Sequence, residues 1–436
     1  MPRIVKRTLL LASVLAVVGA IALLTLLSCA TVETTSRGAP TRFRVPLGVG
    51  DAAFPLYSAT GRQVVLPGLL DGPIVRRAGD GSWPATWFCE DHVEQARGRG
   101  DRLDIDCAGR RHSFALGAPD VPVAVAPMPA RVAVLSDLEG NAAFLGKALH
   151  KLGIVDADGN WHYGAGHLVI LGDSVDRGRD VFAVLWRLHG LAAQAGAAGG
   201  AVHVVLGNHE QYLLRTNPTR ANPEHLHALN MMGGYRQAFA ADTVIGHWLR
   251  RQPVALKLGS VLFVHGGVGP AVARSGLSVG QLNDAMRAYW ARTATGHAPS
   301  ATLDAVLGPA GVTQYRGYFR GLDGHYPAAT AADVQGALDH FDASEIVVAH
   351  TLVERVESLY GGRVRAVDVN NAESRPEVLV YENGVARVVD LGIPRDIERD
   401  EARAFREFSL ADAADRRLLL EMYKDIRRLS ALPYPY

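Results

Sequence analysis

Five short apolar runs, each followed by a polar loop, constrain the fold of this chain more than any other feature of its sequence. The runs lie at 132–135, 167–171, 201–206, 261–264 and 345–349. Helix-like segments follow the first three, such as the one from Asn141 to Leu152, which ends at Gly153. This alternation predicts an α/β fold, in which ligands bind at the edge where the strands end.

Size and composition narrow the class of protein. The chain has 436 residues, which is enough for more than one domain, and its 48% hydrophobic and 20% charged residues exclude a disordered or collagen-like chain. A formal net charge of +1 offers no excess of positive charge for binding nucleic acid, so nucleic acid is not an expected partner. Three cysteines are too few to staple a scaffold of this size, so apolar burial must hold the fold together.

The N-terminal segment has the pattern of an export signal. Three basic residues within the first seven precede an uncharged run from Thr8 to Ser28. This run is also long enough to span a bilayer, so an uncleaved signal anchor is the alternative. Its end, Leu26-Leu27-Ser28-Cys29, resembles the lipobox of bacterial lipoproteins, in which the cysteine is lipidated. We therefore expect residues 1–29 to export the chain to the periplasmic side of the cell envelope, with a membrane anchor at Cys29.

The rest of the chain divides by composition into four segments. Residues 30–41 are a linker, and residues 42–127 form a small β-rich domain, because short alternating runs are broken by Gly, Pro and Asp. Export would place Cys89 and Cys107 of this domain in an oxidising compartment, where they form a disulfide or remain buried thiols. Residues 128–392 are the α/β domain. Residues 393–436 are a helical extension with an amphipathic helix from Leu410 to Leu429.

Residues that can bind metal ions follow all five apolar runs. They are Asp137 and Glu139, Asp173, Asn208 and His209, His265, and His350. Any one of them alone is more often a cap or a loop hydrogen-bonding group, but five occurrences at the same place in a repeating unit indicate a shared site. Oxygen ligands mixed with imidazoles suit Mn, Fe, Zn or Mg, and a carboxylate can bridge two such ions. The pattern predicts a dinuclear hydrolase.

Four sequence blocks resemble a known family. GDSVDRG (172–178) and GNHE (207–210), with FVHGGVGP (263–270) and VVAHT (347–351), are similar to the calcineurin-like metallophosphoesterase superfamily, and more narrowly to the phosphoprotein phosphatase branch and its Shewanella-like bacterial members. The resemblance covers about 131–390. It implies a four-layer α/β/β/α sandwich, to which the small β-rich N-terminal domain is added. It also implies two divalent metal ions, manganese before iron, zinc or magnesium, and a phosphorylated protein or small molecule as substrate.

The resemblance also assigns roles to individual residues. His209 corresponds to the general acid, and Asp176 to the carboxylate that orients it. Arg177 matches an arginine that grips phosphate oxygens, and Arg316 resembles a second one. The metal ligands would be Asp137, Asp173 as the bridging ligand, Asn208, His265 and His350.

One position departs from the family pattern. The first motif is normally DxH, but here it reads Asp137-Leu138-Glu139. Glu139 can still bind metal through oxygen, which would make the site more anionic and favour harder ions such as Mn, Mg or Fe. The alternative is that Glu139 points away and metal is held weakly or not at all.

The predicted reaction is hydrolysis of a phosphomonoester, in which a hydroxide that bridges the two metals attacks phosphorus and His209 protonates the leaving group. Two alternatives stay open: a nucleotidase or dinucleoside polyphosphate hydrolase, and an envelope lipoprotein that binds phosphorylated ligands without turnover. The loop from Thr216 to Met232, with His225 and His227, is expected to border the cleft. Arg236 is a candidate substrate contact beyond it.

Overall fold

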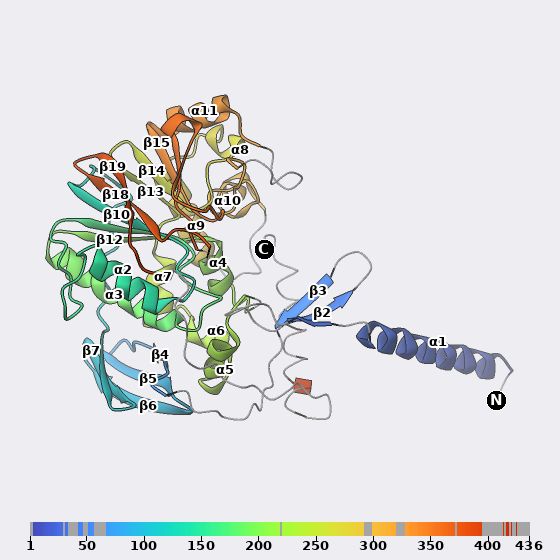
Figure 1. The fold of residues 1–436 in the computed structure, drawn as a ribbon. Coiled ribbons are helices and arrows are strands. Elements are labelled where there is room, and N and C mark those ends of the chain that lie inside the picture. The colour runs from blue at the N-terminus through green and yellow to red at the C-terminus, as the bar shows by residue number, and fades with distance from the viewer. Residues whose placement is uncertain are drawn as a thin grey trace.

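The computed structural model describes residues 3–28, 31–33, 42–46, 51–55, 67–218, 220–291, 299–319, 328–370 and 373–394, with isolated residues between 413 and 424 (Figure 1). The amphipathic helix expected from Leu410 to Leu429 lies outside the described residues except for those isolated positions.

The first large sheet contains the three apolar runs that sequence analysis placed before helices. Its order is β12-β11-β10-β18-β19, where β10 (Arg131–Leu135), β11 (His167–Leu171) and β12 (Ala201–Val205) are parallel. Helix α2 (Ala142–Lys151) connects the first two strands, and α3 (Val181–Ala197) connects the next two. The Asn141 side chain accepts a hydrogen bond from the Phe144 amide and so caps α2 where the sequence predicted its start. Strands β18 (Glu377–Glu382) and β19 (Val385–Asp390) form a hairpin at one edge.

The second large sheet has the order β16-β17-β15-β14-β13-β9. Its strands are β9 (Val125–Ala126), β13 (Ala255–Leu258), β14 (Val261–Val264), β15 (Glu345–Val348), β16 (Glu357–Leu359) and β17 (Val364–Ala366), with the 3₁₀ turn η2 (Tyr360–Gly362) between the last two. Helices α8 (Pro270–Ala273), α9 (Val279–Ala291), α10 (Ala301–Leu307) and α11 (Ala331–Phe341) accompany this sheet. Strand β9 pairs with β13, so pairing in this sheet begins before residue 128.

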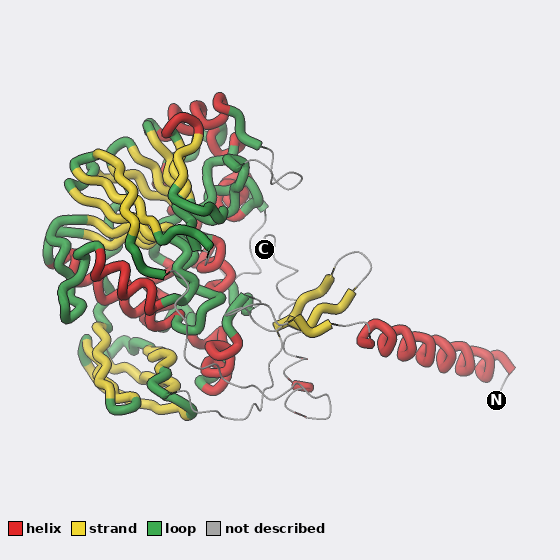
Figure 2. The backbone as a smooth tube through the Cα atoms, in the orientation of Figure 1, coloured by secondary structure: helices red, strands yellow, loops and turns green. Residues whose placement is uncertain are grey.

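The two large sheets lie between helices, as the tube in Figure 2 shows. Strands covered on both faces should be apolar throughout, and β12 is buried at every position. The side chains of β10 from Val132 to Leu135 and of β11 from Leu168 to Leu171 are also buried. This arrangement confirms the α/β/β/α sandwich.

The β-rich region precedes the sandwich, as expected. One sheet contains β4 (Leu70–Val75), β5 (Ser82–Cys89) and β6 (His92–Arg99), and a second contains β7 (Arg102–Cys107) and β8 (Arg110–Ala115). Cys89 and Cys107 form a disulfide that joins these two sheets, which settles the choice between a disulfide and free thiols. A further sheet contains β1 (Thr31–Glu33), β2 (Arg42–Pro46) and β3 (Asp51–Pro55).

The segment expected to direct export is a helix, α1 (Arg3–Ser28). Within the part of the chain whose side chains the structure describes, no helix is both long enough and apolar enough to cross a bilayer.

Four helices follow β12: α4 (Asn208–Leu214), α5 (Pro223–Met231), α6 (Tyr235–Ala238) and α7 (Val244–Arg250). The expectation of a loop from Thr216 to Met232 was therefore wrong for most of its length. Asn222 caps α5 by accepting a hydrogen bond from the Glu224 amide, and Pro223 occupies the first helical position, where proline is favoured. His225 and His227 are buried on α5.

His189 makes the stability of the α/β domain dependent on pH. It is fully buried on α3 between Trp186 and Trp248, and neither ring nitrogen has a hydrogen-bond partner among the described residues. Burial lowers its pKa from 6.5 to about 4. Because the folded pKa lies below the unfolded value, the free energy of unfolding is highest above pH 6.5 and falls as the pH drops toward 4, by up to about 3 kcal/mol.

We therefore expect His189→Leu to reduce the loss of stability between pH 7 and pH 5, measured by urea unfolding. His247→Leu, on the exposed side of α7, is the matched control and should leave the pH dependence unchanged. An unaltered pH dependence in His189→Leu would assign the acid sensitivity to other groups, such as the buried His203.

Candidate active site

The polar loops at the ends of the strands meet, as the sequence pattern predicted. Backbone hydrogen bonds connect the loop after β10 to the loop after β11: the amides of Asp137 and Glu139 donate to the carbonyls of Gly172 and Asp173. The Ala349 amide donates to the His265 carbonyl, which joins the ends of β14 and β15. The candidate residues thus lie on loops that hold one another in place.

These loops have unusual backbone conformations. Twelve described residues other than glycine have positive φ, and six of them are predicted site residues: Asp137, Glu139, Asp173, Asp176, Arg177 and His350. L-amino acids rarely adopt this region, and such residues gather at functional sites, where the surrounding structure holds them.

Two motif glycines allow the loops to approach closely. A Cβ atom on Gly172, whose φ is +83°, would lie 2.3 Å from His265 Nδ1. A Cβ atom on Gly207 would lie 2.2 Å from Asp173 Oδ1. Any side chain at either position would displace a candidate metal ligand, which explains the glycines in GDSVDRG and GNHE.

A group of hydrogen-bond acceptors converges around His265. Its Nδ1 is 2.8 Å from the Leu171 carbonyl, which can only accept, so Nδ1 carries a proton. In the neutral ring Nε2 then carries a lone pair. This atom lies 3.1 Å from both Asp173 Oδ2 and Asn208 Oδ1. Three acceptors at this spacing need a positive charge between them. Burial opposes protonation, but the Asp173 carboxylate outweighs it and raises the pKa of His265 to about 10, so a proton on Nε2 supplies this charge where no cation does.

The ligand atoms of Asp173, His265 and His350 lie within 4.8 Å of one another, and all three residues are buried. His350 Nε2 has no hydrogen-bond partner among the described residues. Burial and the neighbouring charges of His265 and Arg316 hold the pKa of His350 well below 6.5, so its ring stays neutral, as a metal ligand requires. These donors fit a divalent cation.

The carboxylates of Asp137 and Glu139 are not among the ligand atoms that lie within 4.8 Å of one another. Burial, and next the charge of Asp368, raise the pKa of Asp137 well above 3.8. Asp368 was missed in the sequence analysis. The Ser136 hydroxyl donates to the Val367 carbonyl, which brings Asp137 and Asp368 to the same edge. Because Asp368 follows strand β17, the rule that found the other strand-end residues could have found it.

His209 and Asp176 are brought together as predicted. His209 Nδ1 lies 3.0 Å from Asp176 Oδ2, both side chains are buried, and His209 Nε2 is 3.8 Å from Asp173 Oδ2. Burial lowers the pKa of His209, but the carboxylates of Asp173 and Asp176 outweigh it, and the pKa is raised overall. A buried imidazole that a carboxylate orients beside Asp173 is suited to act as a general acid.

The three predicted arginines lie in different surroundings. Arg177 is half-exposed, and its Nη1 lies 2.9 Å from Glu139 Oε1. Arg316 donates to the carbonyl of His350 and to the Thr351 hydroxyl, so it lies against the metal-binding group. Arg236 is exposed on α6.

Two further residues support the site and were not singled out from the sequence. Glu210, the last residue of GNHE, is fully buried and accepts hydrogen bonds from the amides of Gly207, Asp173 and Ser174. It therefore fixes the loop of Asp173 against the start of α4. The Tyr235 hydroxyl donates to Asp176 Oδ1 at 3.4 Å, a contact between distant segments that no local pattern indicates.

Glu139 can act as a metal ligand, as a partner of Arg177, or as both. We expect Glu139→Gln to weaken the binding of one of two metal ions by about tenfold or more, because a neutral amide is a poorer ligand than a carboxylate. Isothermal titration calorimetry with Mn²⁺ measures this metal affinity. Glu224→Gln is the matched control, since Glu224 pairs with Arg179 at 2.8 Å. Metal affinity equal to that of the unsubstituted chain would leave Glu139 only as the partner of Arg177.

The geometry agrees with the metallophosphoesterase site that the sequence motifs predicted. The chain belongs to the calcineurin-like phosphoesterase family, whose model matches residues 130–354. The family uses divalent metals, and the domain is by class a hydrolase of phosphoesters.

Individual relatives agree with this assignment. A solved cold-active protein-tyrosine phosphatase of a psychrophilic Shewanella species superposes with a TM-score of 0.64 at 30% identity, covering 73% of this chain and 99% of that chain. Shewanella-like protein phosphatase 2 of Arabidopsis thaliana is 33% identical over 82 residues, which are 19% of this chain and 21% of the relative. A symmetrical bis(5'-nucleosyl)-tetraphosphatase of Janthinobacterium sp. (strain Marseille) is 34% identical over 136 residues, 31% of this chain and 43% of the relative. The chain thus spans less than half the length of these two curated relatives.

Proposed function

We propose that this protein is a metal-dependent phosphomonoesterase of the phosphoprotein phosphatase type, with phosphotyrosine or a similar aryl phosphate as its preferred substrate. The observation that carries the proposal is the buried His209–Asp176 pair beside the acceptor group of Asp173, Asn208 and His265. Support for the substrate comes from the protein-tyrosine phosphatase to which the chain is similar over nearly the whole of that chain.

The candidate site residues have distinct roles in the proposed reaction. Asp173, His265 and His350 would hold divalent metal, with Asn208, Asp137 and Glu139 as further ligands. Two such ions, manganese in our proposal, would neutralise phosphate oxygens and lower the pKa of the attacking water. Arg177, which is half-exposed, would bind the remaining phosphate oxygens. Arg316 and Arg236 would be further substrate contacts. Asp176 would hold the His209 ring so that its Nε2 delivers a proton to the leaving oxygen.

A dinucleoside polyphosphate hydrolase is the second candidate. Its support is the similarity to symmetrical bis(5'-nucleosyl)-tetraphosphatases, including one of Ralstonia nicotianae that is 36% identical over 103 residues, 33% of that relative.

The test compares substrates and metals on the full chain. The protein is stripped with chelator, supplied with Mn²⁺, Mg²⁺, Fe²⁺ or Zn²⁺, and assayed with para-nitrophenyl phosphate, a phosphotyrosine peptide, a phosphoserine peptide and diadenosine tetraphosphate. We expect metal-dependent hydrolysis that is fastest with Mn²⁺ and the aryl phosphates. Preference for diadenosine tetraphosphate would favour the second candidate, and no turnover with any ion would favour a non-catalytic binding protein.

We also propose that the chain is exported and anchored by lipid at Cys29 on the periplasmic side. The support is the basic start, the apolar run to Ser28 and the lipobox-like sequence before Cys29. Incorporation of labelled palmitate by the chain, and its loss in Cys29→Ser, tests this. Equal labelling of both would refute it.

A further inference from the structure

Strand β4 of the β-rich domain makes a buried contact with helix α5. Asp71 on β4 and His225 on α5 are both buried, and His225 Nδ1 lies 2.7 Å from Asp71 Oδ2. A buried carboxylate next to an imidazole forms a strong hydrogen bond, because the low dielectric that surrounds it strengthens the interaction. This contact ties the β-rich domain to α5.

A second contact ties the same strand to α6. Arg76 follows β4, and its Nη2 donates to both the carbonyl and the side-chain oxygen of Gln237 on α6 at 2.8 and 2.9 Å. Its Nε donates to Asp242 at 3.1 Å. Helix α6 (Tyr235–Ala238) is only four residues long, so its position depends on such contacts rather than on its own stability.

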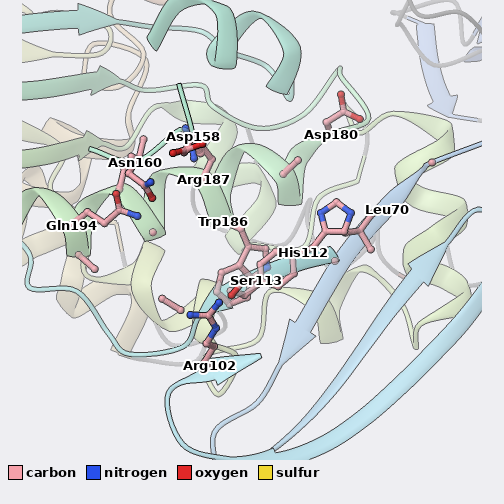
Figure 3. A pocket seen from close by; sticks show the side chains of 18 of the residues that line it. Leu70, Arg102, His112, Ser113, Asp158, Asn160, Asp180, Trp186, Arg187 and Gln194 are labelled. Carbon is pink, nitrogen blue, oxygen red and sulfur yellow. The ribbon is translucent and has the colours of Figure 1, made fainter. Parts of the chain in front are cut away.

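The β-rich domain also packs on helix α3 of the sandwich: β4 and β8 contact α3, and the Phe114 and Trp186 ring centroids are 5.2 Å apart. Beside this packing lies a cavity of about 910 Å³, lined by side chains such as His112, Trp186 and Gln194 (Figure 3). None of the candidate metal ligands lines this cavity. Strand β4 contacts α3, α5 and α7.

Tyr235, at the start of α6, connects these contacts to the site. Its ring packs against His225 and Phe239, with centroids 6.4 and 5.6 Å away, and its hydroxyl donates to Asp176 Oδ1. Burial raises the pKa of Tyr235 well above 10, so the phenol keeps its proton and remains a donor. The other oxygen of Asp176 faces His209 Nδ1.

We propose that Tyr235 is a positioning residue for the general acid, and that the β-rich domain holds it in place through Asp71–His225 and Arg76–Gln237. The phenol fixes the Asp176 carboxylate, which in turn fixes the His209 ring. This inference rests on the proposed function, and it gives the β-rich domain a role in the chemistry although none of the candidate site residues lies in that domain.

The experiment uses leaving groups of different basicity. A general acid matters for an alkyl phosphate and little for para-nitrophenyl phosphate, whose leaving group needs no proton. In the full chain, Tyr235→Phe should lower kcat for an alkyl phosphate about tenfold, change kcat for para-nitrophenyl phosphate less than twofold, and leave KM and bound metal unchanged. Tyr381→Phe is the matched control, because that buried hydroxyl also donates to a carboxylate, Glu345, at 3.1 Å.

The role of the β-rich domain is tested by a double-mutant cycle. Asp71→Asn should lower the alkyl-to-aryl rate ratio about threefold, and added to Tyr235→Phe it should lower that ratio no further, because both act through the same contact. An unchanged ratio in Tyr235→Phe, or a ratio shifted as much by Tyr381→Phe, would overturn the role of Tyr235. Fully additive effects would overturn the link to the β-rich domain. If the unsubstituted chain hydrolyses neither substrate, the proposed function fails, and this inference fails with it.

Discussion

Asp173→Asn should lower kcat/KM for para-nitrophenyl phosphate by about three orders of magnitude and reduce bound metal below two ions per chain. The Asp173 carboxylate is buried at the centre of the site, with Oδ2 3.1 Å from His265 Nε2 and 3.8 Å from His209 Nε2. Burial opposes its ionisation, but His265 and His209 hold its pKa below the usual value, so it stays charged. An amide of the same shape removes that charge, and with it several kcal/mol of transition-state stabilisation.

The substitution should preserve the fold, because Oδ1 can still accept the hydrogen bond from the His209 amide. Activity is measured by steady-state kinetics and metal by equilibrium dialysis with atomic absorption. Glu377→Gln is the matched control: it alters a buried carboxylate that accepts from the Val356 amide outside the site. Asp173→Asn with full activity and two bound metals would refute its role as the bridging ligand.

His209→Ala should slow hydrolysis of alkyl phosphates by about 10²- to 10⁴-fold and affect aryl phosphates with good leaving groups far less. The buried ring lies between Asp176, at 3.0 Å, and Asp173, at 3.8 Å, so it can deliver a proton next to the metal-binding group. The ratio of kcat/KM for the two kinds of substrate measures the effect.

His203→Ala is the control for this experiment. His203 is also buried, but it lies on β12 and bonds His167 at 3.0 Å. Its loss should reduce stability and change both rates by the same factor. If His209→Ala also lowered both rates equally, His209 would serve binding or structure rather than proton transfer.

Most of the sandwich and the membership of its site could be predicted from sequence, because both depend on local patterns. Apolar strands predict the buried sheets, and the rule that loops at strand ends converge predicts that Asp137, Asp173, His265 and His350 meet. The same rule applied to RVRAVDV would have found Asp368. The segment from 216 to 232 was predicted wrongly, because its Pro and Asn suggested a loop, whereas here they start helix α5.

The sequence by itself determined which residues to expect at the site, since the candidate metal ligands and the His209–Asp176 pair each lie in a short motif at the end of a strand. Only the tertiary structure decided what holds that pair in place. Tyr235 reaches Asp176 across 59 positions of sequence, and Asp71 reaches His225 across 154. Such contacts depend on how whole elements pack, and no local spacing of residue types records that packing.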